Sequence, residues 1–543
     1  MRLNKMIAGF SVVLPIICLV SIVMHHRRSS DLFVGFADAR MFENVPRSIN
    51  NSRFTTPRST DGESRSSVIA DERLLGGLLA AGFDDAACIS RYHSYSYRRS
   101  LHNPSSYLVF MLRKYEDRHR RCGPGTISYD LALEQIRSGK REISPDSTSC
   151  SYVVWISFSG LGNKILSLAS TFLYALLTNR VLLVDRGSYM EDLFCEPFPQ
   201  TSWFLPSDFP LLKQFEKFDQ SSSSCYGSLL KNDKLKLDDE ESLPPFLYLH
   251  LVHDYSDHDK LFFCDGDQAL IAKVPWIIVR TDNYFVPSLF LAESFENKLS
   301  RLFPEKTTIF HHLGRYLFHP TNSVWGLITR YYHTHMEKAE EKVGIQVRVF
   351  DARAGPLNHV LNQILACTLK EKILPQVGDD ASSSFPSKNT KMRSVILTSL
   401  NSGYSEFLSN MYWESPTTTG EVVGVFQPSK EGFQQTEKQG HNRKAWAEMY
   451  LLSLTDVLVT SSWSTFGYVA QGLAGLRPWI LYKAENDTSP DPPCGRALSM
   501  EPCFHAPPFY DCKLKRGTDT GSLVPHVRHC EDMSWGLKIV DAQ

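Results

Sequence analysis

The 543-residue chain has almost no net charge, because 58 basic side chains stand against 59 acidic ones. A protein that wraps DNA or RNA needs a clear excess of cationic side chains, so this balance argues against a nucleic-acid partner. The chain also lacks an internal repeat, and it has no C-x-x-C pair, the close cysteine spacing that is typical of a zinc site. Its length and its 42% of hydrophobic residues favour two folded domains with accessory segments.

Only one segment carries a membrane signal. Residues 6–24 (MIAGFSVVLPIICLVSIVM) form a run of 19 residues without a charge, which is just long enough for a transmembrane helix. A cleaved signal peptide is the alternative, but two histidines and two arginines follow at 25–28, with no small-x-small cleavage site. We therefore expect an uncleaved signal anchor, preceded by a cytoplasmic tail (1–5) and followed by a flexible, Ser- and Arg-rich stem (25–70).

Twelve cysteines indicate an oxidising compartment. Cys18 lies in the apolar run, and Cys367, within the helical pattern VLNQILACTLKEKIL, is interpreted as a buried thiol. The other ten can form up to five disulfides. Two N-glycosylation sequons begin at Asn50 and Asn486. These features predict a type II membrane protein whose body lies in the lumen.

Strand and helix patterns alternate along the body of the chain. A strand at 152–160, a glycine turn, a helix at 164–179 and a strand at 180–187 form one unit. The alternation restarts at residue 343 with VGIQVRVF and continues to RPWILYK. Residues 323–339, between the two parts, are interpreted as a linker. Strict alternation predicts doubly wound parallel sheets with helices on both faces.

The predicted fold class is therefore α/β, with two Rossmann-like domains that face a cleft. The first, an acceptor-side domain, is expected over residues 71–340, and the second, a donor-binding domain, over residues 341–485. The Pro- and Cys-rich residues 486–543 are expected to form a disulfide-tied C-terminal wrap.

A lone arginine and a hydroxyl-rich turn stand at the ends of two predicted strands. Arg348 is the single cation in VGIQVRVF, and an unpaired buried guanidinium is costly, so it should meet a fixed negative charge. The turn SSWSTFG (461–467) follows another strand and opens a helix, whose N-terminus adds the positive end of its dipole. These features predict a phosphate site that includes Ser461, Ser462, Ser464 and Thr465. A carboxylate from a neighbouring strand is the alternative partner of Arg348.

Several long runs carry a resemblance to a known family. They are GLGNKILSLASTFLYAL, TDNYFVPSL, FHHLGRYLFHPTNSVWGLITRYY, GIQVRVF, KAWAEMYLLSLTDVLVTSSWSTFGYVAQGLAGLRPWIL and MEPCFHAPPFYDCK. From about Asp71 onward the chain resembles the plant α-1,2-fucosyltransferases, a family that includes the fucosyltransferase acting on xyloglucan. The resemblance implies a GT-B-like Golgi enzyme. It would move L-fucose, with inversion, from GDP-fucose to the 2-hydroxyl of a galactose on xyloglucan or arabinogalactan side chains.

The resemblance also implies roles for residues around the donor. Arg348 would bind the donor diphosphate, and the SSWSTFG turn, including Phe466 and Gly467, would hold the phosphates. In the first domain, the turn at Gly160, Gly162 and Asn163 would let the backbone approach the donor. Lys164 departs from the arginine expected after this turn, and lysine keeps the charge without the bidentate fork.

Asp282 is the candidate general base, because it ends the strand IIVRTDN and matches a family position beside the acceptor. An Asx-turn role within TDNYF is the alternative. His311, His312 and His319 are weaker candidates, since lone histidines in aromatic-rich segments are usually hydrogen-bonded core residues.

Two Asp-x-Asp runs, at 257–259 and 265–267, suggest the manganese site of a different glycosyltransferase architecture. The resemblance implies instead a metal-independent enzyme, with GDP-fucose as co-substrate and no cofactor. The expected partners are a galactose-containing polysaccharide or glycoprotein, the Golgi membrane, and a second copy or other Golgi transferases. Two alternatives stay open: a transferase of the same fold with another nucleotide sugar, and a non-catalytic Golgi protein that binds glycans or other transferases.

Overall fold

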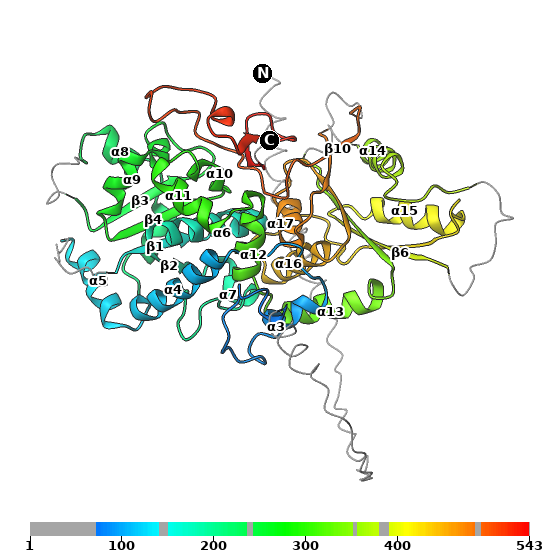
Figure 1. Cartoon of the computed structure of the whole chain (residues 1–543), viewed down its shortest axis with the longest axis horizontal. Helices are drawn as coiled ribbons and strands as arrows, with labels where there is room; N and C mark the ends of the chain where they lie inside the picture. Colours follow the sequence, from blue (N-terminus) through cyan, green and yellow to red (C-terminus); the bar gives the residue numbers. More distant parts are fainter. Residues whose placement is uncertain are drawn as a thin grey trace, which may run out of the picture. The chain divides into compact units, whose positions relative to one another are not determined.

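Two separate β-sheets with helices packed on their faces form the framework of the protein (Figure 1). The computed structural model describes residues 72–140, 150–235, 243–350, 356–378, 390–483 and 490–541, and these belong to one compact unit. The expected signal anchor, the stem and both sequon asparagines, Asn50 and Asn486, lie outside the described residues.

The first sheet contains four parallel strands in the order β2-β1-β4-β3. They are β1 (Tyr152–Ile156), β2 (Val181–Val184), β3 (Phe246–Leu251) and β4 (Trp276–Thr281). In the central strand, Tyr152 lies opposite Val181 on one side and Trp276 on the other. The predicted strand, turn, helix and strand of this region are therefore confirmed.

The second sheet contains six strands in the order β10-β9-β8-β5-β6-β7, and only the β10–β9 pair is antiparallel. Its strands are β5 (Glu341–Val347), β6 (Met392–Ser399), β7 (Val422–Phe426), β8 (Val457–Ser461), β9 (Trp479–Leu481) and β10 (Cys494–Arg496). Four helices alternate with the parallel strands: α14 (Leu357–Lys370), α15 (Gly403–Glu414), α16 (Gln439–Ser453) and α17 (Thr465–Ala474). The predicted doubly wound alternation is confirmed element by element.

Both faces of the central strands are buried, which explains their continuous apolar sequences, whereas the edge strand β7 is partly exposed. In β1, Val153 and Trp155 join the large core that lies between the sheets, whereas Tyr152 and Val154 join a separate cluster on the outer face. This division follows from the two-residue period of a strand. Helix α5 (Ile127–Ser138) covers the outer face, where the indole N–H of Trp276 donates to the carbonyl of Ala132 at 2.9 Å.

Four helices meet between the sheets: α6 (Leu161–Thr178), α12 (Ile309–Leu317), α16 and α17 (Figure 1). Among the described helices, only α6 is long and apolar enough to cross a membrane. However, 89% of its most apolar window is buried inside the protein, as in the core helix of a globular body. The run GLGNKILSLASTFLYALLT therefore forms the centre of the fold.

The prediction of a linker over residues 323–339 is wrong. Helix α13 (Asn322–His335) occupies most of this segment and buries Val324, Trp325 and Ile328. Its aromatic and histidine side chains hid the helical period, and packing against α16 supplies the apolar surface that stabilises it.

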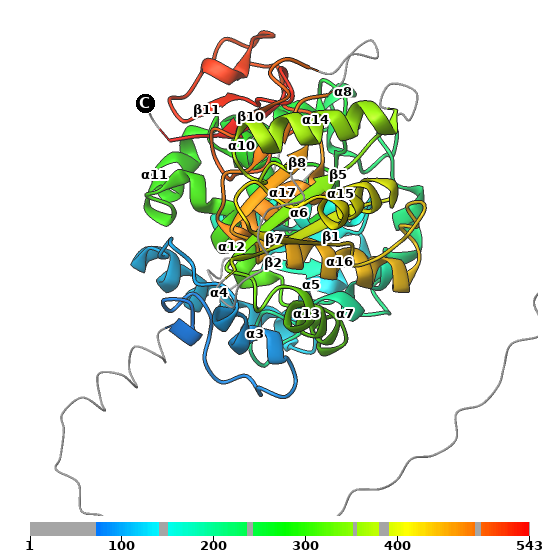
Figure 2. The ribbon, with the colours of Figure 1, turned by 90° about the vertical axis from the view of Figure 1, so that its right-hand side faces the viewer.

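Figure 2 shows the second sheet from its own side, with α14 and α15 in front.

The remaining helices are short or lie at the edges of the two sheets. They are α3 (Ile89–His93), α4 (Ser106–Cys122), α7 (Met190–Leu193), α8 (Tyr226–Lys231), α9 (Asp265–Ala272), α10 (Val286–Leu289) and α11 (Glu293–Leu302). Short 3₁₀ helices cover Ser94–Ser96, Gly187–Tyr189, Leu212–Lys217, Asp259–Phe263, Lys306–Thr308 and Thr520–Ser522.

Five disulfides join the described cysteines: Cys88–Cys195, Cys122–Cys150, Cys264–Cys512, Cys367–Cys494 and Cys503–Cys530. The predicted number is confirmed, but the interpretation of Cys367 as a free thiol is wrong. Cys367 on α14 bonds to Cys494 at the start of β10, and Cys225 is the buried free cysteine of the described chain. The two cysteines are 127 residues apart, so local sequence patterns could not predict the Cys367–Cys494 disulfide.

The C-terminal segment is disulfide-tied, as predicted. Its small antiparallel pair, β11 (Val527–His529) and β12 (Leu537–Ile539), packs near α10. Buried Glu501 accepts hydrogen bonds from the Tyr284 hydroxyl at 2.5 Å and from the Phe310 backbone N–H at 2.8 Å. These contacts attach the C-terminal segment to the turn after β4 and to α12.

Candidate functional site

A cavity of about 330 Å³ is lined by loops from both sheets. The turn after β1 contributes Ser159 to Asn163, and the loops after β5, β6, β7 and β8 contribute the opposite walls. In open parallel sheets, ligands bind outside the carboxyl ends of the strands, which is where this cavity lies.

The N-termini of α6 and α17 meet at this cavity. A Cβ on Gly162 would lie 2.6 Å from Thr465 Oγ1 and 3.0 Å from the backbone nitrogen of Phe466, so only glycine permits the contact. The Thr465 hydroxyl donates to Asn163 Oδ1 at 2.7 Å and links the two helices. Two helix N-termini therefore direct their unsatisfied N–H groups and positive dipole ends toward one space, which suits an anion.

Arg348 lines the same cavity at the end of β5. Its backbone N–H donates to Ser461 Oγ at 2.9 Å, and its Nη2 donates to Gln434 Oε1 at 2.9 Å. Within the described ranges, no carboxylate lies within ion-pair distance of Arg348, and burial alone lowers the pKa of its guanidinium. The alternative ion pair with a neighbouring strand is therefore absent from the described part of the chain. Arg393, at the other end of the neighbouring strand β6, differs, since it pairs with Glu341 at 2.9 Å and Glu421 at 3.0 Å.

The predicted phosphate turn divides into residues that face the cavity and residues that support it. Ser464, Thr465 and Phe466 line the cavity. Ser461, Ser462 and Gly467 are not among the lining residues. The Ser462 hydroxyl donates to the Leu481 carbonyl at 2.6 Å, and a Cβ on Gly467 would lie 2.9 Å from Thr460 Cβ. In this structure the two serines therefore bond to backbone groups of neighbouring strands.

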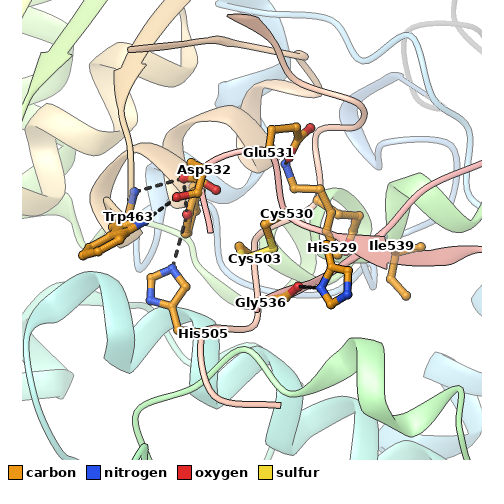
Figure 3. Close-up of a disulfide and its surroundings, with 12 residues drawn as sticks. Trp463, Cys503, His505, His529, Cys530, Glu531, Asp532, Gly536 and Ile539 are labelled. Atoms are coloured by element: carbon orange, nitrogen blue, oxygen red, sulfur yellow. Dashed lines mark hydrogen bonds and ion pairs between the residues drawn. A yellow bond between two sulfur atoms is a disulfide. The ribbon is translucent and has the colours of Figure 1, made fainter. Parts of the chain in front are cut away.

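The C-terminal segment clamps this turn, a feature that the sequence patterns did not reveal (Figure 3). Asp532 Oδ2 accepts the backbone N–H of Trp463 at 2.9 Å and the Tyr468 hydroxyl at 2.6 Å, and the Trp463 indole N–H donates to the Asp532 carbonyl. His505, which lines the cavity, lies 3.2 Å from the Tyr468 hydroxyl through Nε2. The Cys503–Cys530 disulfide joins the two chain segments that contain His505 and Asp532.

This clamp stabilises an uncommon backbone conformation. Trp463 has a φ of 61°, in the left-handed region that non-glycine residues rarely occupy. The bonds to Asp532 hold it there, so that Ser464 can begin α17 and accept the Gly467 N–H with its hydroxyl. The run MEPCFHAPPFYDCK contained His505, but no local signal pointed to Asp532.

Asp282, at the end of β4, does not line the cavity. Its Oδ2 lies 2.8 Å from Nδ1 of His253, and its Oδ1 accepts the His253 backbone N–H at 3.1 Å and the Asn283 side-chain amide at 2.9 Å. The Asp282 side chain is 9% exposed, whereas that of His253 is 69% exposed. Its partners therefore lie largely on the loop after β3, and not only in its own turn. The hydrogen bond to Asp282 raises the pKa of His253.

The Asp282–His253 pair is connected to the rim of the cavity. The Tyr255 hydroxyl, two residues beyond His253, donates to the Ala506 carbonyl at 2.7 Å, next to His505. The negative charge of Asp282 also acts on His505, although burial dominates and lowers the pKa of His505.

The three histidines of the aromatic-rich segment are core residues. His311 Nδ1 lies 2.8 Å from the Gly472 carbonyl and its Nε2 lies 2.7 Å from Ser100 Oγ. His312 and His319 are also buried, and burial lowers the pKa of all three. None of them lines the cavity between the sheets.

Three of the four carboxylates of the Asp-x-Asp runs bond to neighbouring elements of the fold, and the fourth, exposed Asp257, pairs with Lys260. Buried Asp259 accepts the Gly227 N–H at 3.0 Å and the Ser256 hydroxyl at 2.7 Å. Asp265 accepts two N–H groups at the start of α11, and Asp267 accepts the Tyr226 hydroxyl. A separate cluster of potential metal ligands in the described part, Cys503, Cys530 and Asp532, has both sulfurs in a disulfide.

The cavity is also lined by a buried carboxylate that the sequence patterns did not reveal. Glu448 lines the cavity from α16, and its Oε1 accepts the Ser429 backbone N–H at 2.9 Å and the Ser429 hydroxyl at 2.6 Å. Burial raises the pKa of Glu448 to about 7. A charged residue among the buried positions of KAWAEMYLL was the available signal.

Comparisons with known proteins agree with this geometry. A family model described as xyloglucan fucosyltransferase matches residues 47–513. The chain is 59% identical to a galactoside 2-alpha-L-fucosyltransferase of Arabidopsis thaliana, over 99% of this chain and 93% of that protein. It is 63% identical to a galactoside 2-alpha-L-fucosyltransferase of Pisum sativum, over 87% of this chain and 83% of that protein. A solved structure of an Arabidopsis thaliana FUT1 mutant in complex with GDP superposes with a TM-score of 0.81 at 63% identity, covering 86% of this chain and all of that one.

Proposed function

The chain belongs to the xyloglucan fucosyltransferase family, and from this premise we propose that it transfers L-fucose from GDP-fucose to the 2-hydroxyl of a galactose on xyloglucan or a related plant cell-wall glycan. The observation that carries the proposal is Arg348, which has no ion pair among the described residues, beside two helix N-termini in one cavity. This arrangement suits the diphosphate of a nucleotide sugar, which brings two adjacent anionic groups.

We assign the cavity to the donor. Arg348, Ser464, Thr465 and the N–H groups at the start of α6 and α17 would neutralise the charge that develops on GDP when the bond to fucose breaks. Preorganised donors of this kind typically contribute about 10²–10³ each in rate. Ser461, Ser462 and Gly467 would act indirectly, by fixing the ends of β5 and β8.

We also propose the finer architecture that the sequence suggested. The two sheets would be the two Rossmann-like domains of a GT-B-like transferase, since loops from both line the donor cavity. The protein would be a single-pass type II Golgi protein, glycosylated at Asn50 and Asn486, and it would act without a metal. Acceptor glycans and other copies or transferases would be its partners.

For the proton of the acceptor hydroxyl, we propose that Asp282 acts together with His253. Both oxygens of Asp282 already accept hydrogen bonds, so the exposed ring of His253 is the part of the pair that faces solvent. Asp282→Asn is expected to lower turnover far more than GDP affinity, and His253→Gln is expected to remove the acid limb of the pH–rate profile. The control is His333→Gln, which breaks a distant His–Glu pair of 3.1 Å. Unchanged turnover in both site variants would contradict the assignment.

The activity is tested with the full chain, GDP-fucose and galactose-terminated oligosaccharides, with matched acceptors that lack the galactose 2-hydroxyl. We expect an α-1,2-linked product only from acceptors with that hydroxyl, and no transfer from UDP-sugars. A protein that shows no transfer and no GDP-dependent rise in melting temperature would favour a non-catalytic Golgi role instead.

A further inference from the structure

The order of the strands along the sheet edge determines which end of the donor cavity holds the phosphates and which end holds the nucleoside. Arg348 and Thr465 follow the neighbouring strands β5 and β8, and they mark the phosphate end. Thr398, Ser399 and Leu400 lie at the end of β6, and Ser429 follows β7, so these residues lie progressively farther along the sheet edge. A nucleotide with its phosphates at β5 and β8 therefore extends its nucleoside over β6 and β7.

Glu448 lies on the wall of this nucleoside end. Its Oε1 holds Ser429, whereas its Oε2 has no hydrogen-bond partner within the described ranges. No lysine or arginine of the described residues lies within ion-pair distance of this carboxylate, and the nearby Lys444 pairs with Glu431 instead. A buried carboxylate without a cation is costly unless hydrogen-bond donors reach it. The free oxygen thus calls for donors from a ligand.

Guanine offers donors in the required arrangement. Its N1–H and its 2-amino group lie side by side on one edge of the ring, whereas adenine has an acceptor at N1. Leu400, Ala445 and Met449 line the same region and provide apolar surface for the flat ring. We propose that Glu448 is the residue that recognises guanine, accepting from its N1–H and 2-amino group. This inference rests on the proposed function, because it assumes that the cavity binds a nucleoside diphosphate.

A purely structural role is the competing explanation. Glu448 already ties α16 to the loop after β7 through Ser429, and that tie alone would account for its burial. The two explanations differ in their dependence on the ligand. A structural residue affects all nucleotides alike, whereas a guanine reader affects only ligands that carry the donors it accepts.

The test measures the dissociation constants of GDP and of IDP, which lacks only the 2-amino group, for the full chain. We expect the wild type to bind GDP about tenfold or more tightly than IDP, the usual effect of one hydrogen bond to a charged group. In Glu448→Gln this ratio should fall to within about threefold of unity, because the charge is lost. The matched control is Glu431→Gln, since Glu431 also lines the cavity but is neutralised by Lys444; its ratio should stay at the wild-type value.

A second measurement uses the wild-type protein and follows its GDP/IDP affinity ratio as the pH changes. Protonation of Glu448 removes the acceptor, so the GDP/IDP ratio of the wild type should shrink as the pH falls below about 7. The other charged or titratable groups near it are Glu431, Lys444 and His441 on the same wall and Tyr331 on α13. All four groups are retained in Glu448→Gln. Because only the Glu448 carboxylate is lost in this variant, its GDP/IDP affinity ratio should not change with pH.

Three outcomes overturn the inference. The wild type binds GDP and IDP equally; Glu448→Gln weakens both nucleotides by the same factor; or the ratio of Glu448→Gln keeps the pH dependence of the wild type. Failure of the wild type to bind either nucleotide would overturn the proposed function together with this inference, and the first three outcomes leave the proposed function standing.

Discussion

Replacement of Arg348 by glutamine separates a ligand-binding arginine from a structural one. The guanidinium is partly buried, donates to Gln434 Oε1 at 2.9 Å and lacks an ion pair among the described residues. Burial lowers its pKa, which means that the free protein already pays a desolvation cost for this charge. Loss of the charge should therefore cost little stability, about 1 kcal/mol for the Gln434 bond, partly offset by the relief of desolvation.

The effect on catalysis should be much larger. Each preorganised donor to a developing anion contributes about 10²–10³ in rate, and a guanidinium can supply two such donors. We therefore expect Arg348→Gln to lower kcat/KM by at least about 10³-fold, which corresponds to about 4 kcal/mol of transition-state stabilisation. Initial rates of fucosyl transfer and the melting temperature of the GDP-free protein are the two readouts.

Arg393→Gln is the matched control in the same sheet. Arg393 lies at the opposite end of β6 from the cavity, is 7% exposed, and pairs with Glu341 and Glu421. Its removal breaks both ion pairs of a buried guanidinium and leaves Lys391, at 3.4 and 3.5 Å, as the cation beside the two carboxylates. Loss of a buried partner costs up to about 3–5 kcal/mol of stability. We expect this variant to melt several degrees lower with near-normal turnover per folded molecule. Near-normal turnover of Arg348→Gln, or a loss of stability as large as that of Arg393→Gln, would refute the reasoning.

Three further predictions concern packing, cysteines and metal. Gly162→Ala should lower both stability and GDP affinity, because its Cβ would lie 2.6 Å from Thr465 Oγ1. In the control Gly266→Ala, on α9, the added Cβ has no atom within 4 Å, so this variant should be neutral or stabilising. Melting curves with and without GDP compare the two variants. Burial raises the pKa of the Cys225 thiol to about 12, so this thiol should not react with a thiol reagent in the native protein. When the protein is unfolded without reduction, Cys225→Ala should lower the number of reactive thiols by one, and Cys367→Ala should raise it by one because Cys494 is released. An equal number in the two variants would contradict the pairing. Transfer should continue in excess EDTA, and a loss that manganese restores would contradict metal independence.

Local sequence pattern was sufficient for the regular elements. The two-residue period of strands and the helical period of the segments between them predicted β5 to β9 and α14 to α17 in order. The same reasoning failed for α13, whose mixed aromatic, polar and histidine residues show no clear apolar stripe. Its helix is stabilised by contact with α16, which lies more than a hundred residues later in the chain.

The chemistry of the site was predictable in kind but not in detail. A lone arginine at a strand end and a small-residue turn before a helix are local features, and Arg348 and the second half of the turn line the cavity. The inward bonding of Ser461 and Ser462 depends on neighbouring strands, which the sequence does not specify locally. The engagement of Asp282 with His253 likewise depends on the pairing of β3 with β4.

The sequence by itself determined the α/β class, the donor-side elements and Arg348 as a cation of the site, because these follow from short-range periodicity and from the cost of burying a lone cation. Only the tertiary structure decided that Cys367 is bonded and Cys225 free, that Asp532 holds Trp463, and that Glu448 faces the cavity. Each of these depends on contacts between segments that lie far apart along the chain or on the face that a helix turns toward the sheet. Such contacts are set by the packing of the two sheets around a shared core, and local propensity does not encode them.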